Sequence, residues 1–366
     1  MRPLTRAGQI VIVGAGIGGL SAAIALRQRG IGVVVVERAA ALHEVGAGIL
    51  LWPSAMRVLH RLEVGAAIEH AGAVATHGSL RSWRGVLVSR GLAGGLAAGA
   101  GAPLAVHRGL LQSILRPALD KGVLRLGVEC VGVVQDEAGA TVRLADGGSE
   151  QGDLVVGADG LNSLVRASMV DDGPARWSGY VSWRGVVPLD RRLADRLRPG
   201  ESWGRGELFG IAMLGGNQAY WWASAGADEH ASGSPLEEKA AIRRRFGSWH
   251  EPIPELLDAT PEQAIVRSGL YERPALSCWS AGRVGLLGDA AHPMLDSLGQ
   301  GGCQAIEDAA ALAEALDAGP DAATALHVYG ARRMPAAAAA ARRSRAVTRL
   351  APIVHLRNER EPPTGS

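Results

Sequence analysis

The chain has 366 residues, of which 47% are hydrophobic and 20% charged, and its formal net charge is +2. This composition excludes a disordered or collagen-like chain, and the small net charge gives no indication of nucleic-acid binding. Three scattered cysteines, Cys130, Cys278 and Cys303, lack C-x-x-C spacing, so we expect reduced thiols, no metal site and a cytoplasmic protein. No apolar run reaches the roughly 18 residues of a membrane span, so we expect no membrane partner.

The stretch from Gln9 to Arg38 has the pattern of a dinucleotide-binding unit. An apolar run at Ile10–Val13 predicts a buried strand, Ile17–Arg29 predicts a helix, and a second apolar run at Val33–Val36 ends in Glu37. Three glycines at G-x-G-x-x-G spacing fill the first turn: Gly14, Gly16 and Gly19. They allow a tight turn, the approach of a pyrophosphate and close helix packing, while the acid accepts a ribose hydroxyl. The pattern predicts dinucleotide binding but does not separate FAD from NAD(P).

After Arg38, helix and strand patterns alternate. Helices are expected at Pro53–Leu62 and Arg108–Leu119, and strands at Thr76–Ser89, Cys130–Val134, Thr141–Leu144 and Asp153–Val156. Residues 91–103 are a low-complexity Gly/Ala stretch, for which we expect a loop.

From Tyr180 to Ala225 the pattern changes to alternation with period two. It predicts strands at Tyr180–Val187, Glu207–Leu214 and Gln218–Ala223, in an antiparallel sheet with one solvent-facing side. At Arg283 the Rossmann-like pattern returns. Long helices are expected at about Gln300–Leu316 and from Ala323 toward Leu350.

The fold prediction is therefore an α/β protein in which the chain leaves a Rossmann-like nucleotide-binding domain and returns to it. We expect the first part of that domain at residues 1–175, with small sheet elements at 74–106. An inserted antiparallel-sheet substrate domain is expected at 176–275. The second part and the C-terminal helices are expected at 276–366.

Three further segments bear on chemistry. A strand runs into Asp159-Gly160, and Gly288–Pro293 (GDAAHP) follows another, so that Asp289 could accept the hydroxyls of a ribityl chain. Gly299–Gly302 precedes a helix and could present backbone N–H groups to a developing negative charge. We expect His292 to be a structural histidine rather than an acid or base.

In their order along nearly the whole chain, these motifs resemble those of the FAD-dependent aromatic hydroxylases. This single-component class includes para-hydroxybenzoate, salicylate and urate hydroxylases. Besides the glycine fingerprint, the resemblance rests on Glu37-Arg38, GAGI at Gly46–Ile49, His107-Arg108, GADG at Gly157–Gly160 with Ser163 and Arg166, Trp183-Arg184-Gly185, GDAAHP at Gly288–Pro293 and GQGGCQAIEDA at Gly299–Ala309.

The resemblance implies bound FAD and transiently bound NAD(P)H. In such enzymes reduced flavin and O₂ form a C4a-hydroperoxide, which hydroxylates or epoxidises an aromatic or N-heteroaromatic small molecule. It implies that Glu37 binds the adenosine ribose, Arg38 lies beside the adenine and Asp289 binds the ribityl hydroxyls. The residues expected to contact FAD are Gly14, Gly16, Gly18, Gly19, Glu37, Arg38, Gly48, Leu50, Arg108, Val131, Asp159, Asp289, Gly299, Gln300, Gly301 and Gly302.

One position departs from the family. Asp296 stands where the family usually has a proline near flavin C4a; it is either a solvated loop residue or a group that touches substrate. Arg184 either pairs with a carboxylate or phenolate of the substrate, or pairs with a protein acid or caps the flavin edge. These two are the catalytic candidates. Several side chains of the inserted sheet are expected to line a flat pocket: Trp183, Trp203, Phe209, Met213, Tyr220 and Trp222.

Other functions remain compatible with these motifs. A flavin-dependent halogenase or a reductase has the same fold, although Trp221-Trp222 lacks the W-x-W-x-I-P pattern of halogenases. A non-catalytic flavin-binding protein is the alternative from a different class. We expect a monomer or a homodimer.

Overall fold

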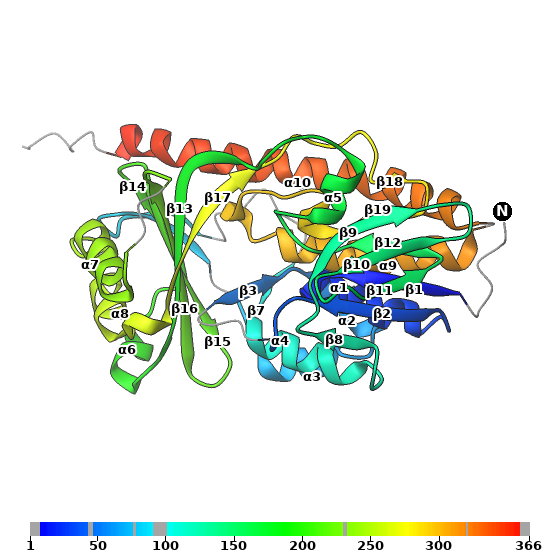
Figure 1. The fold of residues 1–366 in the computed structure, drawn as a ribbon. Helices are drawn as coiled ribbons and strands as arrows, with labels where there is room; N and C mark the ends of the chain where they lie inside the picture. The colour runs from blue at the N-terminus through cyan, green and yellow to red at the C-terminus, as the bar shows by residue number, and fades with distance from the viewer. Residues whose placement is uncertain are drawn as a thin grey trace, which may run out of the picture.

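Two large sheets lie at opposite ends of the molecule (Figure 1). The computed structural model describes residues 8–42, 47–75, 78–90, 101–229, 233–319 and 321–358. Most of the Gly/Ala stretch, residues 91–100, lies outside the described residues. So do Gly46, the first residue of the GAGI segment, and residues 76–77 of the strand expected at Thr76–Ser89.

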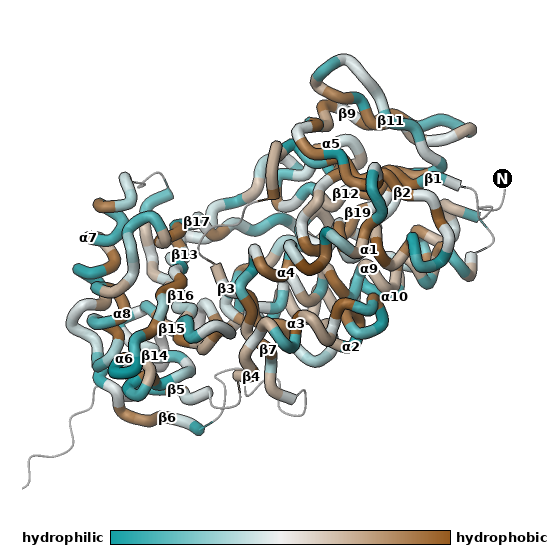
Figure 2. The backbone as a smooth tube through the Cα atoms, turned by 90° about the horizontal axis from the view of Figure 1, so that it is seen from below, coloured by the Kyte–Doolittle hydropathy of each residue, from teal (hydrophilic) through white to brown (hydrophobic). Residues whose placement is uncertain are grey.

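The six-stranded sheet has the order β18-β19-β12-β1-β2-β8, and only its β18–β19 pair is antiparallel. Its strands are Gln9–Val13 (β1), Gly32–Glu37 (β2), Leu124–Leu126 (β8), Leu154–Gly157 (β12), Ser280–Ala281 (β18) and Val284–Leu286 (β19). Strands buried on both faces have continuous apolar sequences, which is why β1, β2 and β12 were visible in the sequence. The pairing of β19 with β12 confirms that the chain returns to its first sheet, and Figure 2 shows this centre as hydrophobic.

Helices pack around the parallel sheet, with α1 against α9 and α9 against α2 and α10. The helices are Ile17–Arg27 (α1), Pro53–Arg61 (α2), Gly65–Ala71 (α3), Arg108–Leu115 (α4), Leu164–Met169 (α5), Gly301–Ala318 (α9) and Ala322–Asn358 (α10). Three 3₁₀ turns accompany them: Arg116–Ala118 (η2), Gly288–Ala290 (η4) and Asp296–Leu298 (η5). In Figure 1, α10 extends from the parallel sheet to the far sheet, and it contacts both β18 and β14.

Two predicted helices end earlier than expected. The first stops at Arg27, because Gly30 adopts a φ of +74° and donates its N–H to the Arg27 carbonyl. The helix expected at 108–119 changes to a 3₁₀ turn after Leu115, because Pro117 has no N–H to continue it.

Two small antiparallel sheets accompany the large ones. The first contains Cys130–Gln135 (β9), Ala140–Leu144 (β10) and Ser149–Gly152 (β11), and the second contains Gly48–Leu51 (β3), Leu104–His107 (β7) and Ala73–Val74 (β4). The strand β11 was not predicted, since its residues are polar or glycine and show no alternation. The β3–β7 pair lies between the two large sheets (Figure 1) and contacts both α9 and β15.

The seven-stranded sheet has the order β17-β13-β16-β15-β14-β5-β6 and is antiparallel except at β14–β5. Its strands are Ser79–Ser82 (β5), Leu87–Arg90 (β6), Arg176–Pro188 (β13), Gly200–Gly204 (β14), Glu207–Leu214 (β15), Gln218–Gly226 (β16) and Ile265–Glu272 (β17). We had expected β5 and β6 among the small sheet elements of the N-terminal part. They instead extend this sheet, because β5 pairs with the edge of β14.

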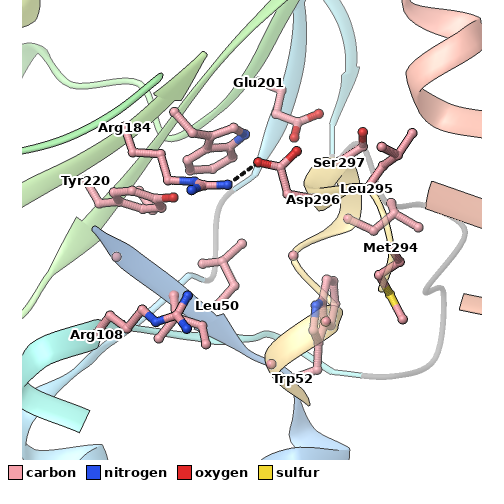
Figure 3. A pocket seen from close by; sticks show the side chains of 18 of the residues that line it. Leu50, Trp52, Arg108, Arg184, Glu201, Tyr220, Met294, Leu295, Asp296 and Ser297 are labelled. Carbon is pink, nitrogen blue, oxygen red and sulfur yellow. Dashed lines mark hydrogen bonds and ion pairs between the residues drawn. The ribbon is translucent and has the colours of Figure 1, made fainter. Parts of the chain in front are cut away.

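Helices cover one face of the seven-stranded sheet: Arg191–Arg196 (α6), Pro235–Phe246 (α7), Ile253–Ala259 (α8) and the turn Glu262–Ala264 (η3). The other face is turned toward the parallel sheet and lines a cavity (Figure 3). No helix in the described ranges is long and apolar enough to cross a membrane.

Candidate active site

The glycine-rich turn of Gly14–Gly19, called the phosphate loop below, is held tightly between β1 and α1. Gly14 has a φ of +106°, and a Cβ there would lie 2.4 Å from the Ala158 carbonyl oxygen. A Cβ on Gly19 would lie 2.0 Å from the carbonyl oxygen of Gly14. A Cβ on Gly16, by contrast, would meet no protein atom within 4 Å. The loop therefore leaves open space at Gly16, where a pyrophosphate can approach the helix N-terminus.

Gly18 has a packing role on the opposite side of this loop. A Cβ there would lie 2.7 Å from the Leu287 side chain and 3.0 Å from that of Ala305. Its small size lets α1 lie against α9 and against the end of β19.

Glu37 holds the phosphate loop from the end of β2. Its Oε2 accepts the N–H of Ala15 at 2.8 Å, and its Oε1 accepts the N–H of Ala39 at 2.9 Å. Each carboxylate oxygen retains a second lone pair, which leaves room for a ribose hydroxyl. Arg38 beside it and Val131 on β9 are both exposed.

Asp159 caps a helix. Its carboxylate accepts the hydroxyl of Ser163, the N-cap of α5, at 2.5 Å and the N–H of Leu164, the first residue of α5, at 2.8 Å. Arg166 in the same helix is fully buried and donates to the Ala290 carbonyl at 3.1 Å. The GADG motif thereby connects the phosphate loop, through Ala158, to the GDAAHP segment.

Asp289 projects from the turn after β19 into the cavity. Its side chain is largely open to that cavity, and its Oδ1 would lie 3.7 Å from a Cβ on Gly301. Burial raises the pKa of this carboxyl, while His292 and Arg108 oppose the shift. Asp289 and the Gly299–Gly302 turn therefore converge at one end of the cavity.

The start of α9 is fixed against β3. Gln300 is the N-cap, and Gly299 turns the chain at a φ of +59°. The thiol of Cys303 donates to the Leu50 carbonyl at 3.3 Å and accepts the N–H of Trp52 at 3.4 Å. Residues of this region and of the adjoining β3 and α4 line the same cavity: Gly48, Leu50, Arg108, Gly299, Gly301 and Gly302.

On the opposite wall, four residues from four neighbouring strands form one row. Register pairs Arg184 (β13) with Trp222 (β16), Trp222 with Gly210 (β15), and Gly210 with Glu201 (β14). A Cβ on Gly210 would lie 2.0 Å from the Trp222 indole, so glycine is what lets the indole lie flat on the sheet. Tyr220 stands beside Trp222, with 5.3 Å between ring centroids, and its ring covers Gly48 of β3.

Arg184 and Asp296 form an ion pair across the cavity (Figure 3). The pairing holds the pKa of Arg184 above its usual value despite burial, and Tyr220 contributes a further hydrogen bond to the guanidinium. Burial raises the pKa of Tyr220 to about 12. Of the alternatives left open by the sequence, Arg184 pairs with a protein acid. Asp296 lines the cavity, and its contact with substrate stays a prediction.

The expectation that six side chains of the inserted sheet share the pocket face is wrong for Trp183 and Phe209. Successive side chains of a strand point to opposite faces, and Trp183 is the neighbour of the pocket-facing Arg184. Its indole donates to Glu238 of α7 at 2.8 Å, and Phe209 packs in the same core.

Two of the other side chains, Tyr220 and Trp222, face the cavity. Met213 borders the cavity, but it has the same parity as Phe209 on β15 and its side chain packs against that core. Trp203 lies on the same face of β14 as Glu201 and donates to it, but it packs against Val347 of α10 and does not line the cavity. The residue that sequence reasoning missed is Glu201 itself, for which the short stretch Gly200–Gly204 gives no alternation signal.

Comparison with known proteins adds independent information. The family described as "FAD binding domain" matches residues 8–344. The chain is 42% identical over 326 residues to an aurachin C monooxygenase/isomerase of Stigmatella aurantiaca, with 89% of this chain and 85% of that protein covered. It is 37% identical over 360 residues to a 3-amino-4-hydroxybenzoate 2-monooxygenase of Streptomyces cremeus, with 95% and 88% covered. The solved structure of HpxO from Klebsiella pneumoniae complexed with FAD and uric acid matches with a TM-score of 0.86 and 28% identity, covering 94% of this chain and 88% of that one.

Proposed function

The chain belongs to this FAD binding domain family and is an FAD-dependent monooxygenase, and we propose that it uses NAD(P)H and O₂ to hydroxylate or epoxidise an aromatic or N-heteroaromatic small molecule. Bound FAD supplies the activated oxygen, with electrons from NAD(P)H. The relatives are named monooxygenases and hydroxylases, so nothing favours the halogenase, the reductase or the non-catalytic flavoprotein.

The observation that carries this proposal is the cavity of about 460 Å³ between the two walls. Asp289 and the Gly299–Gly302 turn form one wall, and the row from Arg184 to Glu201 forms the other. Small-molecule sites commonly have volumes of about 300–1,000 Å³, with mostly apolar walls and a few convergent polar groups. A flat ring held against Tyr220 and Trp222 would face the flavin-binding wall.

The residues that would hold FAD fit its chemistry. Gly16 offers open space beside a helix N-terminus, Glu37 retains acceptor capacity, and Asp289 presents a carboxylate to the cavity. We assign the remaining expected contacts to the same cofactor, with Arg38 and Val131 at its adenine end. Asp159 would act indirectly, by fixing Ala158 against the phosphate loop.

We propose that Asp296 holds Arg184 in place, and that the guanidinium orients an anionic or phenolic group of the substrate. An arginine already held by a carboxylate loses less conformational freedom when it binds a second acceptor. We also propose a cytoplasmic monomer or homodimer, a location that fits three free thiols and a supply of NAD(P)H. The domain division at residues 175 and 275 stays a proposal.

The test of this function is substrate-stimulated NAD(P)H oxidation. We expect urate, 6-hydroxynicotinate or 3-amino-4-hydroxybenzoate to accelerate the oxidation and to yield a product heavier by one oxygen atom. The Arg184→Gln variant should lower kcat/KM for that probe by about 10- to 100-fold, as expected for the loss of a charge-assisted contact. Bound flavin that NAD(P)H reduces at the same rate with and without every probe would contradict the proposal.

The Asp289→Ala variant is expected to bind FAD about 10- to 100-fold more weakly, because the ribityl hydroxyls would lose a charged acceptor. The measurement is the ratio of flavin to protein absorbance, followed by titration of the apoprotein with FAD. Asp171→Ala is the matched control, since Asp171 is exposed outside the cavity. Equal FAD affinity in the two variants would remove Asp289 from the cofactor site.

A further inference from the structure

Glu201 lies in the cavity wall opposite the expected flavin site, and none of the family motifs includes it. It is the second residue of β14, and its pairing with Gly210 puts it on the same face of the sheet as Trp222 and Arg184. Gly200 before it adopts a φ of +131°, and a Cβ there would lie 2.2 Å from the Ser79 carbonyl oxygen. The backbone on both sides of Glu201 is therefore fixed by pairing with β5 and β15.

Two indole N–H groups hold the Glu201 carboxylate. Trp203 donates its Nε1–H to Oε2 at 2.9 Å, and the indole of Trp222 also hydrogen-bonds the carboxylate. Neutral donors of this kind orient a carboxylate without cancelling its charge. The acceptor capacity left over is available to the cavity that Glu201 lines (Figure 3).

No described cation neutralises Glu201. Across the cavity stands Asp296 of η5, a second negative charge, and Asp296 already engages Arg184 of β13. Tyr220 of β16 is a further titratable side chain on this face. On the reverse face of the β14–β5 pair, Arg81 and His250 lie toward Ser202 instead. Burial raises the pKa of Glu201 to about 7, with a smaller contribution from Asp296, although the hydrogen bonds from Trp203 and Trp222 act in the opposite direction.

The two carboxyl groups are therefore unequal. Asp296 has the Arg184 guanidinium beside it, whereas Glu201 has only neutral donors and is the carboxyl whose pKa lies near neutrality. An ionised carboxylate accepts hydrogen bonds and donates none. The matching ligand group is thus a donor, either a ring N–H or a phenolic O–H, at the edge of a ring that lies on Trp222 and Tyr220.

On the basis of the proposed function, we propose that Glu201 binds the N–H or O–H group of an aromatic or N-heteroaromatic substrate and accepts its proton. The bond between hydrogen and the heteroatom breaks, and the proton moves to a Glu201 oxygen. The electron pair stays on the substrate and enriches the ring carbon that is to be oxygenated. That carbon later loses its hydrogen as a proton to water, and the neutral carboxyl returns its own proton to the same heteroatom of the product.

The experiment compares the holoenzyme with its Glu201→Gln variant, using probes that carry the donor and methylated analogues that lack it. The pairs are 6-hydroxynicotinate with 6-methoxynicotinate, and 3-amino-4-hydroxybenzoate with 3-amino-4-methoxybenzoate. Binding is followed by perturbation of the flavin absorbance. We expect the variant to bind the donor probe about 10- to 100-fold more weakly and the methoxy analogue with nearly unchanged Kd. In the parent protein, kcat/KM should fall as the pH drops below about 7, and this acidic limb should be absent from the variant.

Glu207→Gln is the matched control, because Glu207 is a half-buried carboxylate of the neighbouring strand that pairs with Arg245 outside the cavity. It should leave both Kd values and the pH profile unchanged. Glutamine still accepts the indole N–H groups, and FAD content with the melting temperature checks that the Glu201→Gln variant is folded. Unchanged Kd and pH profile in that variant would overturn the inference and leave the proposed function standing. Failure of every probe to perturb the flavin or to stimulate NAD(P)H oxidation in the parent protein would overturn both.

Discussion

The Gly16→Ala variant is expected to fold normally and to bind FAD about 10- to 100-fold more weakly, the consequence of a methyl group that overpacks the pyrophosphate site. Gly16 has a φ of −64° and a ψ of 176°, a conformation that alanine adopts without strain. Its Cβ would meet no protein atom within 4 Å. The free energy of unfolding of the apoprotein should fall by only about 1 kcal/mol, the usual cost of a poorer N-cap residue.

The Gly19→Ala variant provides the contrast within the same loop. Its Cβ would lie 2.0 Å from the Gly14 carbonyl oxygen, so the backbone of the loop itself has to move. We expect both the melting temperature of the apoprotein and the FAD affinity to fall. The two variants are compared by thermal melting and by titration of the apoproteins with FAD. A Gly16→Ala protein with full FAD affinity would show that no phosphate approaches the loop at this glycine.

The phosphate loop was predictable from sequence because its constraints are local. Gly19 packs on Gly14 within the loop and Gly16 faces open space, whereas the contacts with Ala158 are distant in sequence. The apolar runs around the loop are buried on both faces. The GDAAHP and Gly299–Gly302 segments were similarly visible, as short motifs at the ends of a strand and a helix. Their convergence with the phosphate loop requires the chain to return to its first sheet, which the repeated strand pattern indicated.

The substrate wall was less predictable, because it depends on which face of a strand each residue occupies. Composition favoured Trp183 and Phe209 as pocket residues, but the period of two assigns the pocket face to Arg184 and the core face to Trp183. Alternation alone does not say which face is the core. That choice depends on α7 and α8, which come later in the chain and cover one side.

Glu201 could not be found from sequence for a related reason. β14 has only five residues. One neighbouring strand, β15, follows it directly in the chain, whereas the other, β5, comes from a much earlier part of the chain. An isolated glutamate in such a stretch is usually a solvated surface residue. Only the register of four strands shows that it shares a row with Trp222 and Arg184.

The second large effect is expected for Asp308→Asn, which should lower the free energy of unfolding by about 3–5 kcal/mol, the usual cost of breaking a buried ion pair from one side. Asp308 lies fully buried on α9. Its Oδ2 accepts Nε2–H of His292 at 2.5 Å and the N–H of Gly288 at 3.1 Å, and its Oδ1 accepts Nε–H of Arg333 at 2.7 Å. One carboxylate thus joins the turn that carries Asp289 to α10, in agreement with a structural role for His292.

The pH dependence of this stabilisation follows from the two pKa shifts. Burial alone would lower the pKa of His292, but Asp308 holds it above 6.5, so the contribution of His292 is complete below 6.5 and is lost as the pH rises through the raised value. Burial alone would raise the pKa of Asp308, but His292 and Arg333 hold it below 3.8, so its contribution is present above 3.8 and is lost as the pH falls through the lowered value. The contribution of this cluster to the free energy of unfolding should therefore be greatest between pH 3.8 and pH 6.5. The decreases in stability below and above this range should both be smaller in the Asp308→Asn variant.

Urea unfolding of the FAD-saturated proteins at several pH values measures both effects. Asp317→Asn serves as the control on the same helix, because Asp317 is 63% exposed and lies 3.9 Å from its partner Arg29. Its effect should stay within about 0.5 kcal/mol. The Asp308→Asn variant should also lose FAD affinity, since the turn that positions Asp289 loses its anchor at Gly288 and His292. A variant with parental stability and an unchanged pH profile would show that Asp308 and His292 do not form a charged pair in the folded protein.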